Sequence, residues 1–285
     1  WDHHSPSALK KENPCLMAVI DGPNVRFTPF RFALVPPPMF TASITLDAAV
    51  NRVSFYDIET MLVQLSDGSI HFFKMHSNKK PPQFGLPAEK LGQLKIEKEE
   101  DERINKLRLL TLVSDDTFYG VDPSNGSKGD TLVRVVFSFD DLSIVSVEEI
   151  PYPEKIIQLA FHELTQKLFV EGNSGAVFEQ PIDDFPSEQE ESFSQACQLV
   201  SPCIFGGEEV LVGLTDRGVL IIQGNVAASN CSSFAVHDQF LLFPTYAHKL
   251  RLIPLHVSVH DAVELAMANP SSKYDESFRD IERGA

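Results

Sequence analysis

The hydrophobic residues of this chain come mostly in short runs rich in Val, Ile and Phe, and Gly, Asn, Asp or Pro bounds each run. Spacings of three, four and seven residues, which mark one face of a helix, are scarce. Short apolar runs between turn residues are typical of β-strands. The pattern predicts an all-β protein with strands over residues 16–20, 25–30, 53–55, 61–65, 70–74, 107–113, 118–121, 132–139, 156–161, 167–170, 176–180, 210–214, 219–223, 233–236, 240–243 and 249–254.

A unit of strand, tight turn and strand recurs along the chain. Its turns end at Gly22, Gly68, Gly175 and Gly218, each preceded within three residues by Asp or Asn. These residue types adopt the positive φ angles that short hairpin loops require. We interpret the four segments as β-hairpins.

The hairpins repeat at a regular spacing. Gly22 and Gly68 are 46 residues apart, Gly175 and Gly218 are 43 apart, and the longer gap between the two pairs leaves room for another strand-rich unit. A repeat of about 40–45 residues with four strands is the signature of a propeller blade. The sequence therefore predicts a WD-like β-propeller of about five or six four-stranded blades with polar loop insertions. A β-sandwich with hairpins at these spacings is the alternative.

Three successive prolines, Pro36 to Pro38, divide the chain near its start. They hold the backbone extended and remove amide donors, which suits a rigid junction; a ligand for a proline-binding groove is the alternative. We expect residues 1–39 to form a hairpin of a preceding blade and the Pro-rich junction, residues 40–257 to form the propeller blades, and residues 258–285 to be a mobile polar segment. That last segment contains no predicted strand, so we expect the propeller to be incomplete, with a closing blade beyond residue 285.

Polar stretches lie between the predicted blades. Residues 76–87, 97–103 and 183–191 are rich in charge or proline, and we interpret them as solvated loops, with docking segments for a basic partner as the alternative. Residues 89–106, 183–192 and 258–285 have few apolar residues, so we expect them to be mobile surface segments.

The charge balance narrows the possible partners. The chain has 40 Asp and Glu against 24 Lys and Arg, a net charge of −16, which disfavours binding to nucleic acid or anionic membranes. The only modest basic groupings are residues 74–80 and 249–251. No apolar run approaches the length of a membrane span, and the N-terminus has no secretory signal, which favours an intracellular protein.

Recognisable catalytic motifs are absent from the sequence. It has no Gly-x-Ser-x-Gly elbow and no phosphate-binding glycine loop. The neighbours His237-Asp238 and His260-Asp261 are interpreted as turn or edge polar residues, and Asp115-Asp116, followed by Asp122, as part of a hairpin loop. We predict no catalytic, cofactor-binding or metal-binding residue and no enzyme activity.

The four cysteines do not form a metal-binding pattern. Cys15, Cys197, Cys203 and Cys231 include no Cys-x-x-Cys pair, and no clustered histidines accompany them. We interpret them as reduced, packed thiols.

Longer stretches resemble one known family. These are residues 28–39, 213–217, 226–242 and 281–285, which read TPFRFALVPPPM, GLTDR, VAASNCSSFAVHDQFLL and IERGA. They are similar to the large scaffold subunit, subunit 1, of the Elongator complex. The similarity runs in order through nearly the whole chain and is weakest over residues 76–106 and 122–150.

The resemblance implies a non-catalytic scaffold function. It places this chain in the second propeller of a subunit that has another propeller upstream and a helical solenoid downstream. The family scaffolds a complex that modifies carbon 5 of wobble uridines in tRNA, in the cytoplasm, with the nucleus left open. The implied partners are the catalytic subunit, which has radical-SAM and acetyltransferase domains, and the second WD-repeat subunit.

The resemblance also limits what this chain contributes. It implies at most indirect tRNA contact, dimerisation only through regions outside this chain, and no cofactor here. A propeller-based hydrolase and a tRNA-contacting module are the alternative functions, and they would need convergent acids at the ring centre or a basic stripe with aromatics.

Overall fold

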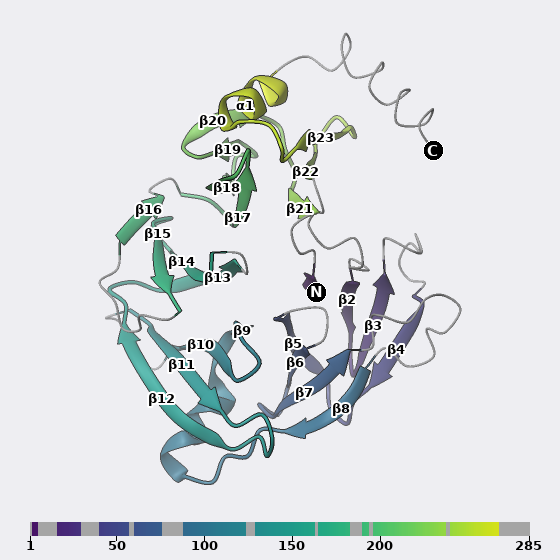
Figure 1. Cartoon of the computed structure of the whole chain (residues 1–285), viewed down its shortest axis with the longest axis vertical. Helices are drawn as coiled ribbons and strands as arrows, with labels where there is room; N and C mark the ends of the chain where they lie inside the picture. Colours follow the sequence, from purple (N-terminus) through teal and green to yellow (C-terminus); the bar gives the residue numbers. More distant parts are fainter. Residues whose placement is uncertain are drawn as a thin grey trace. The chain divides into compact units, whose positions relative to one another are not determined.

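The computed structural model describes residues 2–4, 16–29, 40–56, 60–75, 88–123, 129–162, 165–182, 190–193, 196–237 and 240–267. Within these residues the chain forms six antiparallel sheets, five of four strands and one of three, and strands follow the chain in order through each sheet (Figure 1). The predicted all-β fold is confirmed, and the sheets have the size and connectivity of propeller blades.

The first three sheets use the N-terminal half of the chain. The first contains β1 (Asp2–His4), β2 (Leu16–Asp21), β3 (Asn24–Pro29) and β4 (Ala42–Thr45). The second contains β5 (Val50–Phe55), β6 (Thr60–Leu65), β7 (Ile70–Met75) and β8 (Ala88–Gln93). A 3₁₀-helix, η1 (Glu99–Lys106), leads to the third, which contains β9 (Arg108–Leu112), β10 (Thr117–Asp122), β11 (Thr131–Phe137) and β12 (Ile144–Pro151).

The other three sheets follow in the same way. The fourth contains β13 (Ile156–His162), β14 (Lys167–Gly172), β15 (Val177–Pro181) and β16 (Glu190–Phe193). The fifth contains β17 (Leu199–Phe205), β18 (Glu208–Leu214), β19 (Leu220–Ile222) and β20 (Asn225–Ala228). The sixth contains β21 (Ala235–His237), β22 (Phe240–Pro244) and β23 (Leu250–Pro254), and helix α1 (Val259–Met267) follows it.

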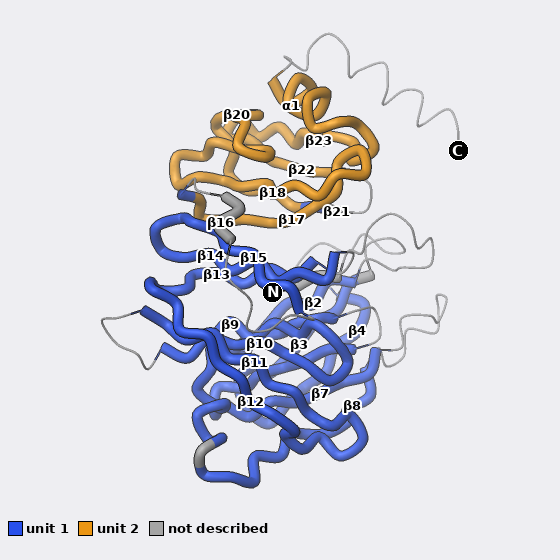
Figure 2. Tube along the Cα trace, turned by 60° about the vertical axis from the view of Figure 1, so that its left-hand side comes forward, with its two compact units in different colours: residues 1–196, 236–239 blue, residues 197–235, 240–285 orange. Residues whose placement is uncertain are grey.

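The chain divides into two compact units, which are coloured separately in Figure 2. Unit 1 comprises residues 1–196 and 236–239, and unit 2 comprises residues 197–235 and 240–285. In unit 1 the first strands of successive sheets lie beside one another, β5 against β9 and β9 against β13. The fourth strands, such as β8 and β12, are therefore the outer strands (Figure 1).

Successive sheets of unit 1 bury their faces against one another. Strand β6 is buried along its whole length: Met61, Val63 and Leu65 pack into the cluster shared with the first sheet, and Leu62 packs into the cluster shared with the third. A third cluster lies between the third and fourth sheets, around Tyr119. Because side chains alternate across a strand, a central strand between two such clusters must be apolar at nearly every position.

Unit 2 carries the one α-helix of the described residues. Helix α1 packs against β20 and β23, with Ala262 and Ala266 buried. Its N-terminus is capped by Ser258, whose hydroxyl oxygen accepts a hydrogen bond from the Asp261 N–H at 3.2 Å.

All three segments predicted to be mobile contain regular structure, since residues 190–192 belong to β16. Residues 89–106 include most of β8 and all of η1, where Ile104 is fully buried in the cluster between the second and third sheets. Residues 258–285 begin with α1. The expectation rested on the small number of apolar residues in these segments. It did not foresee that a single apolar side chain such as Ile104 becomes fully buried when it packs between two sheets. Residues 30–39, 183–189 and 268–285 lie outside the described residues, and the division into domains stays a prediction.

The backbone conformation and the close packing of the hairpin turn at position 68 both require glycine. Its φ is +88°, and a Cβ at this position would lie 2.5 Å from the backbone oxygen of Asn105 in η1. Asp67 completes the turn, because its carboxylate accepts hydrogen bonds from the Ser69 N–H at 2.9 Å and the Ser69 hydroxyl at 2.7 Å.

We predict that Gly68→Ala destabilises the protein more than Gly22→Ala. Both glycines have positive φ, but a Cβ at Gly22 would meet no atom within 4 Å. Gly22→Ala therefore adds only the cost of the φ angle, about 1 kcal/mol, whereas Gly68→Ala also displaces η1 and should cost about 2 kcal/mol or more. Urea unfolding of the two variants measures the difference in their free energies of unfolding. Equal losses of stability would show that η1 moves away from the new Cβ at no energetic cost.

Candidate protein-interaction surface

The paired aspartates of the third sheet form a hairpin turn, as predicted. The Asp116 carboxylate accepts hydrogen bonds from the Ser114 hydroxyl at 2.7 Å and the Thr117 hydroxyl at 2.9 Å, between β9 and β10. Asp115 accepts one from the Thr60 hydroxyl at 3.1 Å. Asp116 is therefore engaged within the turn and Asp115 in a contact with β6 of the second sheet, and the two make no acid-base pair.

The pair His260-Asp261 does not form a site either. His260 and Asp261 lie in the first turn of α1 and not in a turn or at a strand edge, which corrects the sequence interpretation. Asp261 accepts a hydrogen bond from the Ser258 hydroxyl at 2.8 Å, and His260 lies 3.4 Å from Glu264 one turn later. The side chain of His237, and Asp238, lie outside the described residues.

The cysteines and histidines offer no metal site in the described part of the chain. Cys197, Cys203 and Cys231 are free and buried, and burial raises the pKa of the Cys203 and Cys231 thiols. The prediction of packed thiols is confirmed for these three, whereas Cys15 lies outside the described residues. Among the described residues, no three His, Cys, Asp or Glu side chains gather closely enough to hold a metal ion.

The predicted basic groupings are small. Lys74 is exposed on β7, and residues 76–80 lie outside the described residues. Arg251 has a structural role, because its guanidinium donates to the Leu265 carbonyl of α1 at 3.2 Å and lies 5.4 Å from the centre of the Phe243 ring. No helix in the described ranges is long and apolar enough to cross a bilayer.

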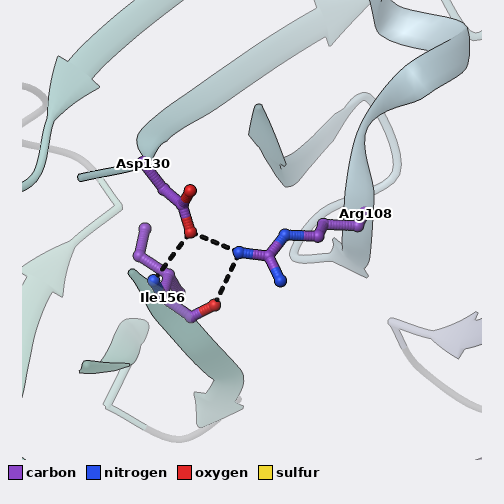
Figure 3. Close-up of polar contacts among 3 residues, drawn as sticks. All are labelled: Arg108, Asp130 and Ile156. Atoms are coloured by element: carbon purple, nitrogen blue, oxygen red, sulfur yellow. Dashed lines mark hydrogen bonds and ion pairs between the residues drawn. The ribbon is translucent and has the colours of Figure 1, made fainter. Parts of the chain in front are cut away.

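An ion pair between a buried aspartate and a partly exposed arginine links the third and fourth sheets (Figure 3). The Asp130 side chain is only 3% exposed and pairs with Arg108 of β9. The carboxylate also accepts the Ile156 N–H of β13 at 2.9 Å, and Arg108 donates to the Ile156 carbonyl at 3.0 Å. These bonds fix where β13 begins relative to β9, so the group is structural.

We predict that Asp130→Ala destabilises unit 1 by about 2 to 4 kcal/mol, because it leaves the Ile156 N–H without its acceptor and removes the partner of Arg108. Glu148→Ala is the matched control. It removes the Arg134–Glu148 pair, which lies near the surface and should contribute less than about 1 kcal/mol. Chemical denaturation of both variants measures the contrast, and losses of equal size would refute the structural role of Asp130.

One carboxyl group is buried without a partner. Glu171 of β14 is 2% exposed, and neither of its carboxylate oxygens has a hydrogen-bond partner within the described residues. Burial raises its pKa from the ordinary 4.5 to about 7. The protein therefore holds this group largely protonated below neutral pH. Alone it makes no catalytic constellation.

We predict that Glu171→Gln stabilises the protein in a pH-dependent way. The folded protein binds the Glu171 proton more tightly than the unfolded chain, so stability present below pH 4.5 is lost as the pH rises through 7. Glutamine cannot ionise, so the variant should gain about 3 kcal/mol over the natural chain at pH 8 and less than about 1 kcal/mol at pH 5.

Urea unfolding between pH 5 and pH 8 tests this, with Glu102→Gln, at an exposed residue of η1, as the control. A Glu171→Gln variant that is less stable at every pH would show that the carboxylate has a partner worth more than its burial costs.

A groove lies at the outer strand of the third sheet. It has a volume of about 450 Å³, and its lining residues come from η1, the residue before it and β12: Lys98, Asp101, Arg103, Ile144, Val145, Ser146 and Val147. The four β12 residues are consecutive, although their side chains alternate between the two sheet faces. The groove therefore borders the edge of the strand. Figure 1 shows the segment between β8 and β9 passing beside β12.

The walls of this groove, which we call the β12 groove, differ in chemistry. The β12 wall is uncharged, and Val145 is 64% exposed. The η1 wall is charged: Arg103 is paired with Glu149 of β12, and Asp101 is 7% exposed. The sequence favours a solvated charge run for residues 97–103. No pattern in the sequence indicates that this segment lies beside residues 144–147.

Comparison with known proteins relates nearly the whole chain to one family. The family described as ELP1 N-terminal second beta-propeller matches residues 19–285. Over 94% of its length the chain is 29% identical to putative elongator complex protein 1 of Xenopus laevis. Over its full length it is 28% identical to elongator complex protein 1 of Mus musculus, and over 95% it is 24% identical to that of Schizosaccharomyces pombe. The chain spans between 21% and 26% of the length of these relatives.

Proposed function

Because the chain belongs to the ELP1 second β-propeller family, we propose that it is a non-catalytic scaffold segment of an Elongator complex, supporting modification of wobble uridine C5 in tRNA. The observation that carries this proposal is the family match over residues 19–285. The relatives in Mus musculus and Schizosaccharomyces pombe are named elongator complex protein 1, and the one in Xenopus laevis putative elongator complex protein 1.

The use of side chains in unit 1 supports a scaffold role. Core strands bury both faces. The carboxylates that could suggest acid-base chemistry, Asp115, Asp116 and Asp130, form hydrogen bonds within a turn or between sheets. Packed sheets of this kind make a rigid body whose outer strands and loops are left for partners.

We further propose the partners that the resemblance implies: the catalytic subunit, with its radical-SAM and acetyltransferase domains, and the second WD-repeat subunit. The net charge of −16 favours contact with proteins over direct contact with tRNA. On this proposal the chain works in the cytoplasm, or in the nucleus, and dimerisation of the subunit uses regions outside this chain.

The test replaces residues 40–267 in the full-length subunit with a flexible linker. We expect fewer partner subunits to co-purify and wobble-uridine modification to fall, as measured by mass spectrometry of tRNA nucleosides. The catalytic subunit, assayed alone, should keep its activity. Normal assembly with full modification would refute the scaffold role.

A control separates the role of this segment from misfolding of the remainder. The removed segment is co-expressed as a separate chain together with the shortened subunit. Recovery of assembly would support a docking function. A different result is that assembly fails to recover while the shortened subunit also loses dimerisation. This result would show that the deletion had damaged neighbouring regions. The comparison would then be repeated with surface variants of the intact subunit.

A further inference from the structure

We propose that the bulge at Leu109 in β9 is a conformational latch. It positions Arg108 for its bonds to the fourth sheet, and it thereby makes the second, third and fourth sheets open as one cooperative unit. Two observations carry this inference: β9 is bonded to the neighbouring sheet on each of its sides, and its backbone is strained between these bonds. The latch belongs to unit 1 and does not depend on the proposed function.

The bulge is a feature that three sheets share. In β9 the register shifts so that Leu109 and Leu110 together oppose Gly120 of β10. The register also shifts by one residue near the start of β5, after Val50, and near the start of β13, after Ile156. A bulge bends its strand and re-aims the side chains beside it. Its recurrence in the first strands of three successive sheets indicates that it serves the junctions between them.

The backbone of the β9 bulge is strained. Leu109 has a φ angle of +55°, in the left-handed region that residues other than glycine, asparagine and aspartate rarely adopt. Gly120 makes room for the bulge, because a Cβ there would lie 2.7 Å from Cδ2 of Leu110. A strained conformation of this kind persists only where surrounding contacts hold it. The bonds that hold β9 on either side therefore determine whether the bulge is kept.

The second sheet holds the backbone of β9 before and after the bulge. Nε2 of Gln64 donates a hydrogen bond to the Leu107 carbonyl at 2.8 Å, and Nε of Arg52 donates one to the Leu110 carbonyl at 3.2 Å. The two bonds enclose the two residues between these carbonyls. They therefore fix the direction in which the side chain of Arg108 leaves the strand.

The fourth sheet is reached by the Arg108 side chain. Its guanidinium pairs with Asp130 and donates a hydrogen bond at 3.0 Å to the carbonyl of Ile156, the first residue of β13. The Arg108 side chain is 43% exposed, so packing alone does not set its direction. Its aim depends on the backbone at its base, which the second sheet fixes. The hydrogen bond from Arg52 should therefore stabilise the start of β13, although its acceptor, the Leu110 carbonyl, lies in β9.

Hydrogen exchange measured by mass spectrometry on the full-length subunit tests this remote effect. We expect Arg52→Met to raise the opening constant of the amides of β13 about threefold or more, as well as that of the amides of β9. The Ser54 hydroxyl accepts the Leu112 N–H at 2.9 Å, and this bond keeps β9 attached to the second sheet in the variant. Unchanged exchange in β13 would overturn the proposal.

The matched control is Thr60→Val. It also removes a hydrogen bond between the second and third sheets, the one from the Thr60 hydroxyl to Asp115 at 3.1 Å, but it does so at the turn between β9 and β10, away from the bulge. We expect faster exchange in that turn and no change in β13. An equal rise of β13 exchange in both variants would show a general loosening of unit 1 and would refute the latch.

A double variant shows whether Arg52 acts through Arg108. When Arg108→Met has removed the side chain that Arg52 positions, the further change Arg52→Met should leave the opening constant of β13 unchanged. Effects of the two substitutions that multiply within about twofold would show independent bonds and would overturn the proposal. Arg108→Lys takes the place of Arg108→Met if the latter does not fold, since it keeps a positive charge beside Asp130 but loses the planar guanidinium.

Substitutions at position 109 test the strain. Leu109→Gly and Leu109→Ala both remove the side chain, but only glycine adopts a positive φ angle freely. In the otherwise natural subunit we expect the opening constant of β9 to be about fivefold lower in the glycine variant than in the alanine variant. When Arg52→Met and Arg108→Met are both present, the bulge relaxes and the two variants should become equal. A difference that persists there would show that the bulge does not depend on these bonds, and the latch would be refuted.

Discussion

The packing of successive sheets face to face is the constraint on which unit 1 depends. Central strands such as β6 have an apolar cluster on each side, so almost every residue in them is committed to the core. A substitution there is felt by two sheets at once. Because of this constraint, the core strands have few side chains free to contact a partner. The outer strands, the turns and the connections between sheets remain available for such contacts.

Connections between sheets are therefore more than linkers. The segment from β8 to β9 crosses from an outer strand to an inner one, and on the way it buries Ile104 between the second and third sheets. In doing so it places Asp101 beside β12. The connection between β12 and β13 is held at its far end by Asp130, whose carboxylate accepts the Ile156 N–H. Polar groups are buried here where they determine how one sheet meets the next.

The sequence predicted the central strands and most of the inner strands, but it missed the inner strands β1 and β17 and the outer strands. Strands predicted from apolar runs, such as 61–65 and 210–214, lie within one residue of β6 and β18 at their C-terminal ends. Strands β8 and β20 were not predicted, because most of their residues face solvent and carry no apolar run. The outer strands of a blade have only one neighbouring strand, so their sequences need less hydrophobicity.

The groove could not be found from the sequence for a related reason. Its two walls are separated by about forty residues, and each wall alone has an ordinary explanation, a solvated charge run and the end of a strand-rich unit. The burial of Ile104, the ion pair of Arg103 with Glu149 and the hydrogen bond from the Lys95 N–H to the Leu142 carbonyl bring them together. Asp101 likewise cannot be distinguished from Glu99 or Glu102 by residue type, since the difference among them is burial, which depends on the fold.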